Sequence, residues 1–269
     1  MKTTILCTPV LLVSIAAAQP SPDRIVSAMQ DRQLAEYAMR LNTDDRITLY
    51  QQLSEAKTEN LHYQVLLAGA FIQKMRDTTD YGYLDRADKV LQRVLSADSA
   101  NYEALRLRTE IELERHHFKQ AVEYSQQLTK TAPGDAWNWG TLGDAYIELG
   151  DYNRAADAYQ KMINLRPNLS SYNRAAHYRF LTNDLNGAIE IMKQAIESGS
   201  TSPENVAWCY VELGAYYLKA GRLADAEYAY TNALRTFPKY HPAYAGLGKV
   251  RIAQGKTDDA VQQFLRAQV

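Results

Sequence analysis

A small residue recurs along this chain at nearly constant intervals, and this recurrence constrains the fold more than any other feature. The residue is alanine, at Ala87, Ala121, Ala155, Ala188, Ala226 and Ala260. The successive differences between these positions are 34, 34, 33, 38 and 34. Self-similarity at such a period is typical of repeat architectures, in which each unit buries its apolar face against its neighbours. The sequence therefore predicts a stack of similar units.

Each alanine belongs to a helical pattern. In every copy except the one with Ser125, a bulky residue follows four positions later, about one helical turn on. A second pattern precedes three of the alanines: an aromatic residue, then Leu-Gly, then a further large side chain. It comprises Trp139, Leu142, Gly143 and Tyr146; Tyr210, Leu213, Gly214 and Tyr217; and Tyr244, Leu247, Gly248 and Arg251. A turn glycine follows each copy, so we predict two helices per unit.

This signature resembles the tetratricopeptide repeat, which has the same residue types over 34 positions. Pro167 and Pro238 close two copies where that family has proline. The resemblance is strong from residue 102 to 269, and it implies an all-α fold, a right-handed solenoid of antiparallel helix pairs. The signature residues it assigns are Leu142, Gly143, Tyr146, Ala155, Tyr159, Pro167, Leu213, Gly214, Tyr217, Ala226, Tyr230, Pro238, Gly248 and Ala260.

The signature has a steric reason. Glycine and alanine permit neighbouring helices to approach closely, and the aromatic residues fill the space between them. Large side chains at Ala155 should overpack this contact at a cost of roughly 1–3 kcal/mol.

The unit boundaries follow from the period. We expect repeat units at 102–135, 136–168, 169–206, 207–240 and 241–269, preceded by a degenerate unit at 63–101 and an N-terminal capping pair of helices at 19–62. Two departures stand out. The segment 76–82 should form a longer connection than the usual turn, and the insertion at 198–203 should bend or loosen the stack.

The first 18 residues have the features of an export signal. Lys2 precedes an apolar run from Ile5 to Ala18 that ends in small residues. The run is shorter than the ~20 residues of a membrane-spanning helix, so a retained anchor is the less favoured alternative. We expect an exported protein, periplasmic or secreted, with no membrane span after signal removal. Cys209 is then the only cysteine, which favours a small buried side chain and excludes internal disulfides.

Composition and motifs argue against several functions. The formal net charge is -1, without the basic surplus that binding to nucleic acid requires. The sequence has no phosphate-binding glycine loop, serine nucleophile elbow or zinc-protease motif, so we expect no enzyme, no cofactor and no metal. The adjacent His116 and His117 should be solvated turn residues. The mixed charges between Arg106 and Arg115 should form a solvated helix face.

The resemblance also implies where a ligand would bind, because such proteins usually bind partners on the first helices, at the concave side. The positions carried over are Trp137, Asp144, Glu148, Asn173, His177, Trp208, Lys219 and Lys249. Aromatic residues with an amide suit an extended peptide. The two tryptophans could instead pack between units, an alternative of about equal weight.

The most favoured function is therefore a non-enzymatic interaction scaffold or adaptor, which binds a peptide or protein in its concave groove outside the cytoplasm. One alternative is a self-assembling structural envelope protein, because Val261, Phe264 and Leu265 are expected to be partly uncovered and could form a homo-oligomer through the C-terminal helix. Another is an accessory subunit of an enzyme, or a hydrolase without recognisable motifs.

Overall fold

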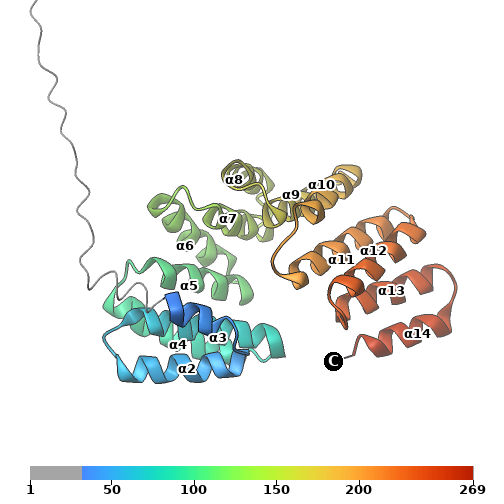
Figure 1. Cartoon of the computed structure of the whole chain (residues 1–269). Helices are drawn as coiled ribbons and strands as arrows, with labels where there is room; N and C mark the ends of the chain where they lie inside the picture. Colours follow the sequence, from blue (N-terminus) through green and yellow to red (C-terminus); the bar gives the residue numbers. More distant parts are fainter. Residues whose placement is uncertain (1–31, 269) are drawn as a thin grey trace, which may run out of the picture.

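The computed structural model describes residues 32–268, and these form a curved array of helices without a strand in that range (Figure 1). The helices with complete bounds are α2 (Thr43–Ala56), α3 (Leu61–Thr78), α4 (Gly82–Ala97), α5 (Tyr102–Glu114), α6 (Phe118–Thr131), α7 (Ala136–Glu148), α8 (Tyr152–Leu165), α9 (Leu169–Leu181), α10 (Leu185–Ser198), α11 (Pro203–Lys219), α12 (Leu223–Thr236), α13 (His241–Ala253) and α14 (Thr257–Arg266). The predicted signal at 1–18 and the start of the capping segment lie outside the described residues.

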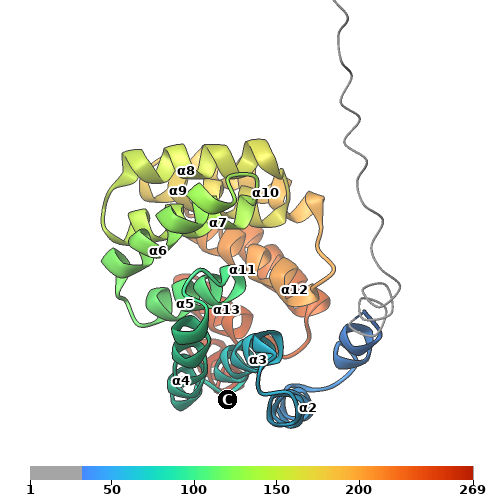
Figure 2. The same ribbon diagram turned by 90° about the vertical axis from the view of Figure 1, so that its left-hand side faces the viewer.

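The helices pack as consecutive antiparallel pairs, with α3 on α4, α5 on α6, and so on to α13 on α14. Both views show the chain rising from α2–α4 to α8–α10 and descending to α13, so the array forms an arch (Figures 1 and 2). The predicted fold class, a right-handed solenoid of antiparallel helix pairs, is confirmed.

The first helices of the pairs form the inner layer of the arch. Each of α3, α5, α7, α9 and α11 contacts the next odd-numbered helix, while in residues 32–268 the even-numbered helices have no comparable contacts with one another. In a curved stack, the helices on the inside lie closer together than those on the outside. The odd-numbered helices, which contact one another, therefore form the inner layer. In Figure 1, α7 and α11 accordingly lie nearer the centre of the arch than α8 and α12.

Local chemistry explains where the helices begin and turn. Asparagine or aspartate caps many helix starts with its side-chain oxygen, as Asp135 does for α7 and Asn168 for α9. The turn inside each pair needs a left-handed residue, which is Gly150, Gly221 or Gly255 in three units. Asparagine is the next best residue for this conformation, and Asn183 adopts it between α9 and α10.

The signature glycines lie against aromatic rings of the second helix. A Cβ atom at Gly143 would lie 2.3 Å from the Tyr159 ring, and one at Gly214 would lie 2.8 Å from the Tyr230 ring. Ala155, on the same helix as Tyr159, is fully buried. The steric reading of the signature is thus confirmed, because any side chain at these glycines would displace the ring.

The prediction of a long connection at 76–82 is wrong. Helix α3 continues to Thr78 and α4 begins at Gly82, so only three residues join them. Thr79 takes the left-handed conformation at φ 57°, and its N–H donates to the carbonyl of Met75. The additional residues therefore lengthen the first helix.

Of the two effects expected of the insertion at 198–203, bending or loosening of the stack, loosening is not observed. One apolar core continues from Leu169 to Val250, and the ring of Phe180 on α9 stacks on Tyr216 of α11 at 4.8 Å. Helix α11 has 17 residues against 13 in α9, so part of the added length is taken up as helix. Packing across α9 and α11 holds this region together.

Candidate functional site

A cavity of about 430 Å³ opens on the inner layer, where α7, α9 and α11 meet. Its lining consists of Asp144, Tyr159, Asn173, Arg174, His177, Trp208 and Glu212. Four of the eight predicted groove residues are therefore brought together, from three successive units. The two sides of this cavity differ in how their polar groups are satisfied.

On the α7 side the charged groups are paired within the chain. Arg174 donates from Nη2 to Asp144 Oδ2 at 2.8 Å and from Nε to Oδ1 at 2.9 Å, and the Tyr159 hydroxyl donates to the same Oδ1 at 2.9 Å. Burial and the adjacent Asp144 charge raise the pKa of Tyr159 well above its usual value. Burial alone would lower the pKa of Arg174, but the Asp144 charge and hydrogen bond outweigh it and raise that pKa. This side is a closed, charge-neutral contact.

On the α11 side the polar groups have no partners in residues 32–268. The side chains of Asn173, His177, Trp208 and Glu212 make no hydrogen bond or ion pair there. Trp208 is 45% exposed, although it is among the largest side chains. Burial raises the pKa of the Glu212 carboxyl, and His177 only partly opposes this shift. Free donors, acceptors and an aromatic face therefore point to the α11 side as the part that can bind a ligand.

The other four predicted groove residues lie outside this cavity. Trp137 is half-buried and packs between units, with the Arg106 guanidinium 4.4 Å from its ring centre. Glu148 is exposed and borders a separate, smaller cavity with Asp144. Lys219 and Lys249 are exposed on α11 and α13. The cavity thus unites only part of the predicted groove.

Sequence reasoning missed two residues of the cavity, Arg174 and Glu212. The signal that could have found them is positional: Arg174 follows Asp144 by 30 residues, and Glu212 follows His177 by 35 (212 − 177). The alanine spacings for these two units are 33 and 38, so each offset equals one repeat minus three residues (33 − 3 and 38 − 3). The two pairs occupy equivalent positions in the repeat.

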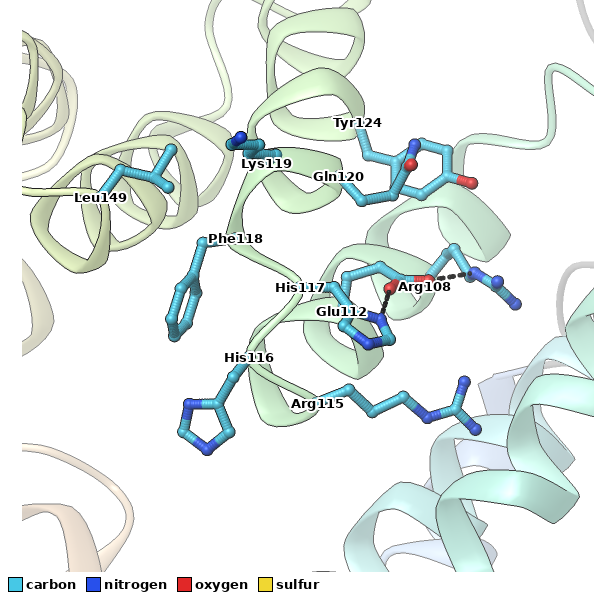
Figure 3. Close-up of a pocket in the computed structure, with 10 residues that line it drawn as sticks. All are labelled: Arg108, Glu112, Arg115, His116, His117, Phe118, Lys119, Gln120, Tyr124 and Leu149. Atoms are coloured by element: carbon cyan, nitrogen blue, oxygen red, sulfur yellow. Dashed lines mark hydrogen bonds and ion pairs between the residues drawn. The ribbon is translucent and has the colours of Figure 1, made fainter.

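A larger cavity of about 620 Å³ lies at the turn between α5 and α6 (Figure 3). Its charged groups are joined in a network: Glu112, 3% exposed, forms an ion pair with Arg108, whose Nε lies 2.9 Å from Oε1, and its Oε2 lies 2.8 Å from His117 Nδ1. Arg108 and Arg115 also pair with Asp88 of α4. The predicted solvated helix face is therefore wrong here, because α4 covers part of it. The exposure predicted for His116 and His117 is confirmed.

The larger cavity is the weaker candidate for binding. Arg108 is already ion-paired with Glu112 and Asp88, and Arg115 with Asp85 and Asp88, so a charged ligand would have to break these pairs. Glu112, Arg108 and Asp88 instead connect two neighbouring units.

Cys209 is buried, as the sequence predicts. Burial, with a smaller contribution from Glu212, raises the pKa of its thiol to about 12. A thiol in that environment packs as a small apolar side chain.

An array of helix pairs with an open inner layer defines the class of this protein: it is a helical-repeat solenoid. Family models described as tetratricopeptide repeat match residues 136–169 and 217–268. The chain is a tetratricopeptide repeat protein, and proteins with this repeat generally mediate protein–protein interaction.

Solved structures share the fold. A tetratricopeptide repeat protein from Parabacteroides merdae has a TM-score of 0.60 and 17% identity, covering 81% of this chain and 91% of that one. The Cut9–Hcn1 structure, from an APC/C hetero-tetramer, has a TM-score of 0.70 and 14% identity, covering 84% of this chain and 43% of that one.

Among curated proteins, human Superkiller complex protein 3 is 30% identical over 132 residues, which is 47% of this chain and 8% of that protein. The chain spans only a small part of the curated relatives that it matches. Within residues 32–268, no helix combines the length and apolar character that crossing a membrane demands.

Proposed function

We propose that this protein is a non-enzymatic adaptor that binds a peptide or protein segment in the inner cavity between α7, α9 and α11. The observation that carries the proposal is the α11 side of the cavity, where the amide of Asn173 has free donors and acceptors beside the half-exposed ring of Trp208. An amide can pair with both groups of a peptide backbone, and a half-exposed indole supplies apolar contact area.

Two further points support the proposal. Tetratricopeptide repeat proteins generally act through protein–protein interaction and are typically non-catalytic scaffolds. The names of two similar proteins, the Superkiller complex protein and the Cut9–Hcn1 assembly, refer to multiprotein complexes. We further propose action outside the cytoplasm, which depends on the apolar segment at 1–18. Self-association through α14, where Val261 and Leu265 are exposed, stays a prediction.

A random-peptide selection tests the binding proposal. A phage-displayed library is selected on the purified protein, and the enriched peptides are titrated against variants by fluorescence anisotropy. Trp208→Ala should raise the Kd about 30-fold, the effect of losing a central aromatic anchor worth roughly 2 kcal/mol. Asn173→Ala should raise it about tenfold through the loss of backbone pairing.

Tyr228→Ala is the matched control, because Tyr228 is 67% exposed on the outer helix α12. Its Kd should equal that of the unaltered protein, and circular dichroism should show equal helicity in all variants. Failure to enrich any peptide, or equal binding by the Trp208 and Tyr228 variants, would refute the inner cavity as the binding site.

A further inference from the structure

A tryptophan and an acidic group of the inner layer each have an arginine beside them at one contact between units and lack it at another. We call the contact of two neighbouring first helices a joint, and name it by those helices. The relevant joints are α5–α7, α7–α9 and α9–α11. Because the units are equivalent, a residue at one joint has a counterpart at the next.

The first position is the tryptophan six residues before the signature glycine. Trp137 stands there in α7, and the guanidinium of Arg106, on the preceding α5, covers its ring at 4.4 Å. Trp208 is the counterpart in α11, also six residues before its glycine. The counterpart of Arg106 is Asn173, since each lies 15 residues before its repeat alanine (121 − 106 and 188 − 173). The ring of Trp137 is thus covered by a cation, whereas at the equivalent ring of Trp208 an amide stands in place of the arginine.

The second position is the acidic group of the joint. At the α7–α9 joint, Asp144 is neutralised by Arg174. At the α9–α11 joint, the same two positions hold His177 and Glu212, which make no hydrogen bond or ion pair with each other. A partly buried carboxylate without a cation is unfavourable, as the raised pKa of Glu212 indicates.

The charges that line the cavity do not supply the missing cation. Arg174 is engaged by Asp144, so this pair contributes no net charge. Over the carboxylates and the guanidinium of Asp144, Arg174 and Glu212, the sum of charges is −1 + 1 − 1 = −1. The cavity is thus complementary to one positive charge, placed between a carboxylate and an indole face.

We propose that the α9–α11 joint is a receptor for one lysine or arginine side chain of a bound protein segment, with Glu212 as its ion-pair partner and Trp208 as its aromatic wall. The incoming cation would cover the Trp208 ring as Arg106 covers Trp137, and would pair with Glu212 as Arg174 pairs with Asp144. Cation–π contacts and charge-assisted hydrogen bonds are both strengthened by partial exclusion of water. This inference rests on the proposed function and specifies its partner: a segment with a basic side chain.

The test uses the selected peptides, synthesised with acetylated and amidated ends so that terminal charges play no part. We expect them to share a lysine or arginine at one position. Replacing an arginine there by citrulline, or a lysine by norleucine, should raise the Kd about tenfold. Glu212→Gln should raise the Kd of the basic peptide by a similar factor and leave the Kd of the neutral peptide unchanged.

Glu204→Gln is the matched control, since Glu204 is an exposed carboxylate on the same helix α11, outside the cavity. It should leave both peptides unaffected. Peptides that bind through Trp208 without any basic side chain, or equal binding by Glu212→Gln and the unaltered protein, would overturn this inference and leave the adaptor function standing. If no peptide binds at all, the adaptor proposal itself fails.

Discussion

The α7–α9 and α9–α11 joints use the same repeat positions in opposite ways. At the first joint, Asp144, Arg174 and Tyr159 form a hydrogen-bonded group from three helices, and the arginine is 24% exposed at its side chain. At the second, His177 and Glu212 face the same cavity without a bond between them. One backbone geometry thus supports either a closed internal contact or an open one.

The comparison shows how a repeat protein separates stability from binding. Every unit needs the signature residues to pack, whereas the polar positions of the inner layer are free to vary. An ion pair at such a position connects neighbouring units, and an unpaired group at the same position is available to a ligand. We therefore expect substitutions in the Asp144–Arg174 pair to change stability, and substitutions at its counterparts His177 and Glu212 to change ligand binding.

The largest expected effect comes from opening the closed joint. Asp144→Ala leaves Arg174 partly buried without its carboxylate and removes the acceptor of the Tyr159 hydroxyl. We expect the free energy of unfolding to fall by about 2–3 kcal/mol, as for other charged groups left unpaired on partial burial. Urea unfolding followed by circular dichroism measures this change.

His177→Ala is the matched substitution at the open joint. Because its side chain makes no hydrogen bond, the loss should stay within about 0.5 kcal/mol. Equal losses for Asp144→Ala and His177→Ala would show that the two joints do not differ as described.

An intermediate effect is expected from closing the open joint. The double variant His177→Asp with Glu212→Arg transfers the charges of Asp144 and Arg174 to their counterparts. The new ion pair should raise the free energy of unfolding by about 0.5–1 kcal/mol, the range of a partly exposed pair with good geometry. The same variant should lose affinity for the basic peptides, since its own arginine then occupies the receptor.

Each single substitution is a control for this double variant. Either one alone should lower the unfolding midpoint or leave it unchanged, because the new charge has no partner. A midpoint of the double variant below both single variants would mean that the joints are not structurally equivalent.

The fold was predictable from the sequence because the repeat is enforced by packing. The spacing of the alanines and the glycine beside Tyr159 leave one way to stack the pairs, and the helices follow it. The two wrong predictions, for 76–82 and 198–203, were based only on the number of residues in these segments. The extra residues lengthened helices instead of loops: α3 extends to Thr78, and α11, which begins at Pro203, has 17 residues.

The site was only partly predictable, for a reason of charge pairing. Family positions suggested Asp144 and Trp208 but gave no weight to Arg174 or Glu212. Whether an arginine extends into solvent or bends onto a carboxylate 30 residues earlier depends on tertiary distance, which no local pattern contains. The burial of Glu112 was missed for the same reason, because it depends on α4 and its Asp88.

The smallest effect is the pH dependence of the open joint. Burial raises the pKa of Glu212 above its ordinary value of 4.5, and the nearby His177 acts in the opposite direction. The folded state therefore holds this proton more tightly than the unfolded state. Its stabilising contribution is full below the unfolded pKa and is lost as the pH rises through the raised, folded pKa. At neutral pH the ionised carboxylate consequently destabilises the protein.

Glu212→Gln isolates that contribution, because it keeps the shape of the side chain and removes the charge. The gain in free energy of unfolding of this variant over the unaltered protein should be smallest below pH 4.5 and grow as the pH rises through the folded pKa. Urea unfolding across that range measures it, and a gain independent of pH would contradict the assignment. A saturating basic peptide should reverse the sign at neutral pH, since the carboxylate then has the cation that Asp144 has in Arg174.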